Sequence, residues 1–248
     1  YTQGKLANWY LSQARKAIKK ASTIITISDF SKSEIETYWG KEISIHIATL
    51  ASSKPINPDH TLTKEPNILY VGGFDVRKNI PTLIDALALI KEEFPNVKLT
   101  LPGRYTPSIL VPDLTELIEF HQLQDNIYFA GFVTDTELEK LFQEARVFIY
   151  PSRYEGFGLP ILEAMGQGIP VICSRKGAMG EAAGKASYGL DTTNAKYIAE
   201  AAIKILKDDT LAQSLQKKGY KRAQNFTWTK TAKRIQYAFQ ETLKVKDS

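Results

Sequence analysis

The chain has 248 residues, 43% of them hydrophobic and 24% charged, which is the composition of an ordinary globular protein that buries a sizeable core. Its formal net charge of +5 suits an anionic partner, such as a nucleic acid, an anionic membrane surface or a phosphorylated small molecule, without choosing among them. The single cysteine, Cys173, excludes an intrachain disulfide, the three scattered histidines form no zinc motif, and no apolar stretch reaches the roughly 18 residues that would span a bilayer.

Residues 1–50 predict a short succession of helices and strands. Residues 5–20 fit an amphipathic helix whose apolar face carries Trp9 and Tyr10. Its other face is basic, and we favour a helix packed on the protein over one lying on a membrane surface. The next expected elements are a strand over 23–27, a helix opened by the capping pair Ser31 and Glu34 and ended by Gly40, and a strand over 43–47.

Residues 51–66 lack periodicity and contain three prolines, which predicts a linker at a domain boundary. The expected organisation is therefore a first part over residues 1–50, the linker over 51–66, a domain over 67–226 and a C-terminal helix over 227–248.

From residue 67 onwards, short apolar strands alternate with helices. Strands are expected at 68–71, 97–101, 127–130, 147–150 and 170–173, and helices at about 80–94, 114–123, 134–145, 160–167 and 197–207, with further helix to about 244. This alternation with short connections predicts a doubly wound, Rossmann-like parallel α/β sheet. Such sheets bind ligands at the carboxyl ends of their strands, so the loops that follow the strands are the places to look for a site.

The loop after Tyr150 carries two carboxylates around a glycine-rich turn. Gly156 and Gly158 leave the backbone open to close approach, and the helix that follows turns its positive end toward a bound phosphate. Glu155 and Glu163, the latter expected in the first helical turn, suit the vicinal hydroxyls of a sugar or ribose. The alternative is a simple glycine turn whose glutamate stabilises the helix dipole.

The loop after Val71 combines glycines with cations. Gly72 and Gly73 allow a tight turn, and Arg77 and Lys78 follow near the start of the next helix. Two cations beside a helix N-terminus would hold a diphosphate and stabilise its charge as it leaves. A solvated basic turn is the alternative.

Two further loops would face the same edge of the sheet. Phe132 and Val133 follow the strand that ends at Gly131 and could border a nucleobase, although core packing of Phe132 explains the pattern equally well. Gly103 and Arg104 add another glycine and cation, with the same ambiguity.

Together these loops resemble the family-4 retaining glycosyltransferases of the GT-B fold, which carry a Glu-x7-Glu motif. The resemblance rests on residues 23–31, 68–73, 77–79 and 147–165, with Glu155 and Glu163 as the two glutamates. It covers most of the chain, and implies that residues 67–226 are the domain that binds the nucleotide-sugar donor.

The resemblance assigns roles to the loop residues. Glu155 would face the donor sugar, Glu163 the ribose, and Arg77 and Lys78 the diphosphate, so that Glu155, Arg77 and Lys78 form the catalytic set. The remaining donor-binding residues would be Gly72, Gly73, Gly103, Arg104, Phe132, Val133, Gly156, Phe157, Gly158 and Leu159. Such enzymes retain the anomeric configuration and need no cofactor and usually no metal, because cations and the helix dipole stabilise the leaving diphosphate.

The sequence also departs from the family pattern. Many members carry an arginine where this chain has Phe74, so Arg77 is expected to replace it. Residues 177–181, ending in Glu181, differ from the usual run at that place. The resemblance implies that residues 1–50 are only the last elements of an N-terminal acceptor-binding domain, and the family's histidine from that domain has no counterpart here.

The predicted function is the transfer of a sugar from a UDP- or GDP-sugar to a glycan or lipid-linked acceptor, with this chain supplying mainly the donor-binding half. A non-catalytic nucleotide-sugar-binding module of a larger polysaccharide-assembly protein is the alternative, and a GT-B epimerase or phosphorylase would use a similar cleft. A nucleic-acid-binding protein is disfavoured because the basic residues form no stripe interleaved with aromatics. By family likeness, a cytoplasmic place is expected, with a peripheral contact to the inner face of the membrane left open.

Overall fold

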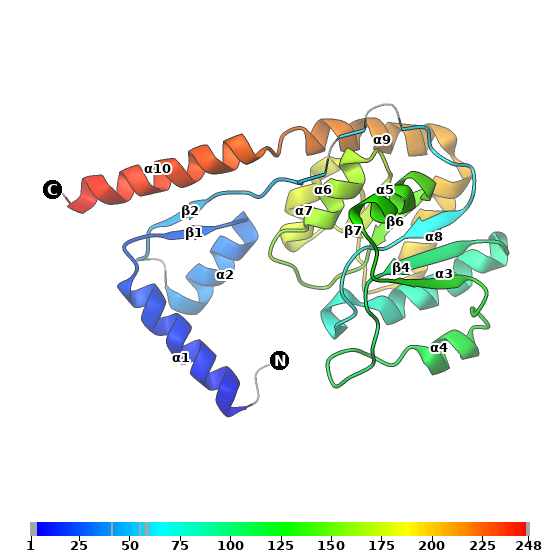
Figure 1. Cartoon of the computed structure of the whole chain (residues 1–248), viewed down its shortest axis with the longest axis horizontal. Helices are drawn as coiled ribbons and strands as arrows, with labels where there is room; N and C mark the ends of the chain where they lie inside the picture. The colour runs from blue at the N-terminus through cyan, green and yellow to red at the C-terminus, as the bar shows by residue number, and fades with distance from the viewer. Residues whose placement is uncertain (1–3, 41, 55, 58–59, 247–248) are drawn as a thin grey trace. The chain divides into compact units, whose positions relative to one another are not determined.

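The computed structural model describes residues 4–40, 42–54, 56–57 and 60–246. The chain divides into two compact units. Figure 1 labels most of their helices and several of their strands. The small unit joins Tyr1–Leu50 to Thr227–Ser248, and the large unit is Ala51–Phe226.

The small unit pairs two strands and adds three helices. Its elements are α1 (Lys5–Lys20), β1 (Ile24–Thr26), α2 (Asp29–Trp39), β2 (Ile45–Ile47) and α10 (Trp228–Lys246). β1 and β2 run parallel, with Ile24 opposite Ile45. The Thr231 hydroxyl donates to the Thr49 carbonyl oxygen at 2.6 Å, and Arg234 donates to the Thr49 hydroxyl at 2.7 Å, so α10 is tied to the segment after β2.

Two details of the small unit differ from the sequence-based prediction. Helix α2 is capped by Ser28, whose side-chain oxygen accepts from the Ser31 amide at 2.9 Å, so the prediction that Ser31 opens the helix is wrong by three residues. Trp9 and Tyr10 on α1 are 54% and 63% exposed, so the face that was expected to pack leaves both rings open in this chain. Gly40 ends α2 as predicted, with a positive φ of 93°.

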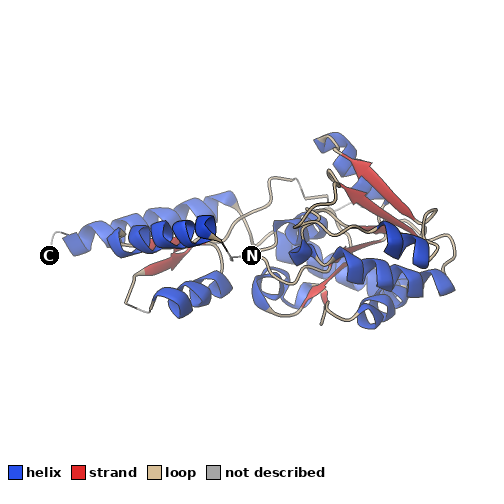
Figure 2. Ribbon diagram, turned by 90° about the horizontal axis from the view of Figure 1, so that it is seen from below, coloured by secondary structure: helices blue, strands red, loops and turns tan. Residues whose placement is uncertain are grey.

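The large unit is a six-stranded parallel sheet with helices on both faces (Figure 2). Its strands are β3 (Asn67–Leu69), β4 (Lys98–Pro102), β5 (Ile127–Gly131), β6 (Val147–Tyr150), β7 (Val171–Ser174) and β8 (Tyr188–Leu190). Its helices are α3 (Ile80–Glu93), α4 (Thr115–Phe120), α5 (Asp135–Glu144), α6 (Leu159–Gly166), α7 (Gly177–Ala183), α8 (Ala195–Lys207) and α9 (Asp209–Ala223), with 3₁₀ turns η1 (Val76–Lys78) and η2 (Gly184–Ala186). The predicted doubly wound fold is confirmed.

The strand order β5-β4-β3-β6-β7-β8 explains where a ligand would bind. The chain moves outward from β3 to β5, returns to the centre at β6, and then moves outward in the other direction. The loops after β3 and β6 therefore diverge at the centre of the sheet, which is the place where doubly wound sheets bind ligands. All four residues of β6 are buried, as expected for a central strand covered by helices on both faces.

The sequence analysis missed α7 and β8. Both elements are short and glycine-containing, so neither shows a clear period. Gly180 in α7 packs on the carbonyl of Arg175, to which an added Cβ would come within 1.9 Å. A tertiary contact of this kind leaves no mark in the periodicity of the sequence.

Residues 51–66, predicted as a linker, lie against the large unit where the structure describes them. The Asn57 amide donates to the Gly166 carbonyl oxygen at 2.8 Å, and Tyr220 donates to the Asn57 carbonyl oxygen. Arg146 donates to the Thr63 carbonyl oxygen at 3.2 Å. The segment thus contributes to the packing of this unit, while Pro55, Pro58 and Asp59 lie outside the described residues.

Within the described ranges, no helix combines the length and the apolar character needed to cross a membrane.

Candidate functional site

A half-buried ion pair joins the loops after β3 and β6. Lys78 Nζ lies 2.6 Å from Glu155 Oε1, and the two side chains are only 13% and 14% exposed. The Tyr150 hydroxyl donates to the same carboxylate oxygen at 2.9 Å, and Lys78 Nζ lies 3.3 Å from that hydroxyl. We call these three residues, Lys78, Tyr150 and Glu155, the switch-point cluster.

A second tyrosine supports the cluster from beneath. The ring of Tyr70 stacks on that of Tyr150 with centroids 5.9 Å apart, and its hydroxyl donates to the Gly73 carbonyl oxygen at 2.6 Å. Burial raises the pKa of both tyrosines, and the nearby Glu155 carboxylate raises it further, so both hydroxyls stay protonated as donors. A Cβ at position 72 would come within 2.3 Å of the Tyr70 hydroxyl, which explains why glycine is needed at Gly72.

Arg77 lies beside Lys78 on η1 and points to a different partner. Its Nε donates to Asp75 Oδ1 at 2.8 Å, and its side chain is 43% exposed. Partial burial would raise the pKa of Asp75, but the hydrogen bonds and charge of Arg77 outweigh it, and the pKa is lowered. The two predicted phosphate-binding cations are thus adjacent, one half-buried and one open.

Asn79 is a structural residue that the sequence analysis did not single out for the site. It is buried and adopts the left-handed conformation, with φ of 59°. Its Nδ2 donates to the carbonyl oxygens of Pro151 at 3.2 Å and Thr192 at 2.8 Å, and its Oδ1 accepts from Arg153 Nε at 3.1 Å. The Arg153 amide in turn donates to the Arg77 carbonyl oxygen at 2.8 Å. The loops after β3, β6 and β8 are therefore held together around one amide side chain.

The glycine-rich turn leads into α6 through Gly158, whose φ is 110°. The helix begins at Leu159, one residue before the expected Pro160, so Glu163 lies beyond the first turn. The prediction that Glu163 sits in the first turn is therefore wrong, because the left-handed Gly158 starts the helix early. Phe157 is buried edge-on against Phe226, so its side chain is not available to a ligand.

Glu163 has fewer polar contacts than Glu155. It is partly buried and makes no side-chain hydrogen bond to the described residues. Burial raises the pKa of its carboxyl group, an effect that the Lys54 charge opposes and the Asp135 charge reinforces. Lys54 itself pairs with Asp135. Lys54 was missed because it belongs to the segment predicted as a linker, and only the fold brings it near Glu163.

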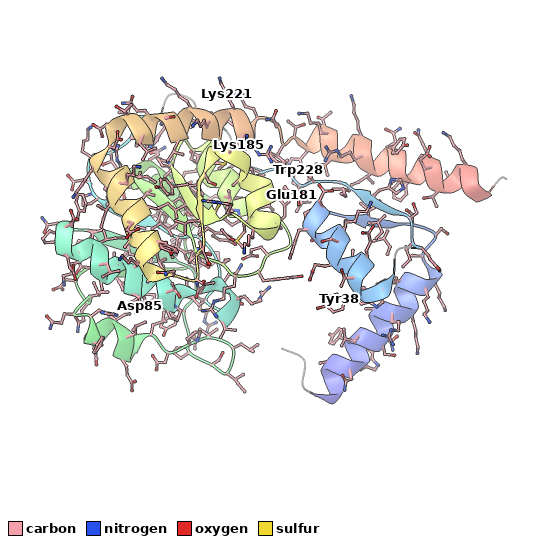
Figure 3. All side chains as sticks on the ribbon, turned by 180° about the vertical axis from the view of Figure 1, so that it is seen from behind. Tyr38, Asp85, Glu181, Lys185, Lys221 and Trp228 are labelled. Atoms are coloured by element: carbon pink, nitrogen blue, oxygen red, sulfur yellow. The ribbon has the colours of Figure 1, made fainter. Side chains whose placement is uncertain are left out.

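The outlying predicted residues are placed as follows. The Gly103 amide donates to the Gly131 carbonyl oxygen at 2.7 Å, which joins the loop after β4 to the end of β5. Phe132 is 91% exposed, so core packing does not explain it. Arg104 is exposed and Val133 partly buried. Figure 3 labels Glu181, which belongs to helix α7 and not to a loop.

The arrangement supplies both kinds of polar group that a nucleotide sugar needs. Arg77 and Lys78 offer donors for an anion, while Glu155 and Glu163 offer acceptors for hydroxyl groups. In the part of the chain that the structure describes, no three acidic, histidine or cysteine side chains gather as metal ligands.

Comparison with known families shows to which family the chain belongs. The family model described as glycosyl transferases group 1 matches residues 53–222. The chain belongs to the group 1 glycosyltransferases. This membership agrees with the predicted resemblance to GT-B enzymes.

Relatives of this glycosyltransferase chain include a mannosyltransferase and a glycogen synthase. It is 32% identical over 229 residues to the O-antigen chain mannosyltransferase B of Escherichia coli, covering 86% of this chain and 59% of the relative. It is 27% identical over 222 residues to the glycogen synthase of Mycobacterium tuberculosis, covering 87% of this chain and 53% of the relative. The chain thus spans little more than half the length of either relative.

Solved structures agree on the fold. The sucrose-phosphate synthase of Thermosynechococcus elongatus superposes with a TM-score of 0.82 at 26% identity, over 96% of this chain and 62% of that one. The Anabaena protein HepE, solved with UDP and glucose, superposes with a TM-score of 0.74 at 19% identity, over 90% of this chain and 64% of that one. The second likeness bears on the fold alone.

Proposed function

We propose that this chain forms the nucleotide-sugar-binding part of a retaining glycosyltransferase, which moves a sugar from a UDP- or GDP-sugar to a glycan or lipid-linked acceptor. The observation that carries the proposal is the half-buried Lys78–Glu155 pair at the centre of a doubly wound sheet. A cation and a carboxylate held together at this place suit a ligand that joins a diphosphate to a sugar.

Lys78 and Arg77 bind the diphosphate in this proposal. A lysine ammonium has three donors, and the switch-point cluster uses two of them, on Glu155 and Tyr150. One donor therefore remains for a phosphate oxygen without loss of the ion pair. Arg77, with its exposed guanidinium, adds a second cation that stabilises the charge developing on the leaving diphosphate.

The two carboxylates bind opposite ends of the donor. Glu155 accepts from sugar hydroxyls with its remaining lone pairs, and Glu163 accepts from the ribose. The backbone of residues 156–159, namely Gly156, Phe157, Gly158 and Leu159, lines the phosphate and sugar, because it leads into the N-terminus of α6.

The remaining contacts are proposed from the positions of the residues in the fold. Gly72, Gly73, Gly103 and Arg104 border the donor at the carboxyl ends of β3 and β4, and the exposed Phe132 with Val133 borders the base. No metal and no cofactor take part in the proposed reaction. The acceptor is held by an N-terminal domain of which residues 1–50 are the last elements, and the enzyme works in the cytoplasm, at most in peripheral contact with the membrane.

Calorimetric titration of the chain with UDP and with GDP tests the proposal. We expect one of the two to bind, and Lys78→Met to weaken that binding roughly tenfold or more through loss of a charge-assisted contact. Lys140→Met, which removes an exposed lysine on α5, is the matched control and should bind as the parent does. Folded protein that binds neither nucleotide would refute the donor site. Sugar transfer by the longer protein separates an enzyme from a binding module.

A further inference from the structure

A cavity of about 690 Å³ opens beside the switch-point cluster, where β7 and β8 end and α8 begins. Its volume lies within the range of small-molecule sites, roughly 300–1,000 Å³. The residues that matter for its chemistry are Arg153, Arg175, Tyr188, Asp191, Tyr197 and Glu200. None of them belongs to the proposed donor site.

Two of the charged groups of this β7–β8 cavity are held in place by local hydrogen bonds. Arg175 donates from both Nε and Nη2 to the Gly189 carbonyl oxygen, at 3.1 and 2.7 Å. Asp191 accepts from the amide and the hydroxyl of Thr193, at 3.0 and 2.6 Å, and these bonds lower the pKa of its carboxyl group. The cavity therefore presents oriented donors and an oriented, ionised acceptor.

Two tyrosines add flat apolar surface. Tyr188 is half-buried, and Tyr197 on α8 is 49% exposed. Neither ring stacks on another aromatic ring among the described residues. Tyr188 packs partly on the hydrophobic core, so Tyr197 offers the more exposed ring surface to a ligand. A tyrosine face packs on apolar C–H groups while its hydroxyl takes part in hydrogen bonds.

The mixture of groups discriminates among ligand classes. An anion would be attracted by Arg153 and Arg175 but would also meet the carboxylates of Asp191 and Glu200. An apolar ligand would remove all four charges from water without replacing their hydrogen bonds. A neutral polyhydroxyl ligand uses donors and acceptors alike and packs its C–H face on the tyrosines. The chemistry of the cavity therefore fits a sugar.

The cavity lies within reach of the donor site. Neighbouring strands are separated by about 4.8 Å, so the end of β8 is roughly 10 Å along the sheet edge from the end of β6. Arg153 connects the two places, because its side chain lines the cavity and its amide donates to the Arg77 carbonyl oxygen at 2.8 Å. A short oligosaccharide spans such a distance.

We propose that the β7–β8 cavity binds sugar residues of an extended glycan, remote from the residue that reacts. The proposal rests on the glycosyltransferase function in so far as that function supplies a glycan acceptor or product. The cavity holds the chain of that glycan while the donor occupies the switch-point cluster.

The test uses the whole chain with two linear α-linked tetrasaccharides, mannotetraose and maltotetraose, followed by ligand-observed NMR. We expect saturable binding of at least one of them. Tyr197→Ala should weaken it roughly tenfold through loss of one ring face, and Glu200→Gln should weaken it less. Tyr38→Ala, which removes a 69% exposed helical tyrosine from α2, is the control and should leave binding unchanged.

UDP and GDP titrations on the same samples separate this inference from the donor site. Nucleotide binding without tetrasaccharide binding overturns the cavity proposal and leaves the donor site standing. Tetrasaccharide binding that Tyr197→Ala weakens supports the cavity, whether or not a nucleotide binds. Binding that Lys78→Met abolishes and Tyr197→Ala leaves intact, or that inorganic phosphate displaces, overturns it.

Discussion

The two glutamates of the Glu-x7-Glu motif occupy opposite environments. Glu155 is held by Lys78 and by the Tyr150 hydroxyl in a half-buried cluster. Glu163 is also partly buried, but makes no side-chain hydrogen bond within the described ranges, and burial raises the pKa of its carboxyl group. One carboxylate is compensated before any ligand binds, and the other is not.

This difference indicates that the two residues serve the site in different ways. A compensated carboxylate is stable in its ionised form, and it positions the lysine as much as it accepts from a ligand. An uncompensated, desolvated carboxylate costs stability that a hydroxyl donor recovers on binding. We therefore expect changes near Glu155 to damage both fold and binding, and changes at Glu163 to separate the two.

The largest effect is expected from Lys78→Met. It leaves the Glu155 carboxylate half-buried without its cation, which should lower the free energy of unfolding by about 3 kcal/mol. The double variant Lys78→Met/Glu155→Gln should recover most of that loss, because it removes the orphaned charge. Urea denaturation of the two variants and the parent measures both differences.

The control for this prediction is Arg77→Met. Arg77 is 43% exposed and its pair with Asp75 is solvent-screened, so we expect a loss below about 1 kcal/mol. Equal losses for Arg77→Met and Lys78→Met would show that the burial of the cluster does not matter, and the comparison between the two glutamates would fail.

Asn79→Ala tests whether the loops around Glu155 depend on one buried amide. Loss of its bonds to the Pro151 and Thr192 carbonyl oxygens leaves buried acceptors unpaired, and we expect a loss of about 2–3 kcal/mol. Asn79→Gly loses the same bonds but adopts the φ of 59° freely, so it should be about 1 kcal/mol more stable than the alanine variant. Thermal unfolding followed by circular dichroism distinguishes the two variants. An unchanged midpoint for both would show that the loops around Glu155 do not depend on Asn79.

Gly158→Ala tests the turn that separates the two glutamates. Alanine at a φ of 110°, with its Cβ 3.2 Å from Ile161 Cδ1, should cost about 1–2 kcal/mol and shift α6 relative to the loop. Gly73→Ala is the matched control, since its φ is not in the left-handed region and its Cβ would have no neighbour closer than 3.7 Å. A stability loss at Gly73 as large as that at Gly158 would contradict the role of backbone conformation.

The smallest effect on stability, and one of opposite sign, is expected from Glu163→Gln. Because burial raises the pKa of Glu163, the stability tied to its protonated form is full below the unfolded-state pKa of about 4.3 and is lost as the pH rises through the folded-state value. The glutamine variant should therefore be more stable than the parent at pH 7 and equal to it at about pH 4. Nucleotide affinity should fall in the same variant.

Denaturation across this pH range, with nucleotide titration at pH 7, measures both parts. A variant that is less stable than the parent at neutral pH would mean that Glu163 is compensated in the fold, and the contrast with Glu155 would disappear.

Much of the fold could be predicted from the sequence, because local patterns encode it. The alternation of apolar runs and amphipathic segments was enough to predict the parallel sheet from β3 to β7 and most of its helices. Short elements such as α7 and β8 escaped, because their formation depends on contacts such as that of Gly180 with the Arg175 carbonyl. The N-cap of α2 at Ser28 and the start of α6 at Leu159 were also misjudged, by three residues and one.

The candidate site was likewise predictable from the sequence only in part. The sequence by itself determined which residue types follow the central strands, because the glycines, cations and glutamates of the loops can be identified without knowledge of the fold. Only the tertiary structure decided that Lys78 pairs with Glu155, 77 positions away, that Asn79 joins three loops, and that Lys54 lies near Glu163. The physical reason is that pairing and burial depend on distances between segments far apart in the chain, and local periodicity carries no record of those distances.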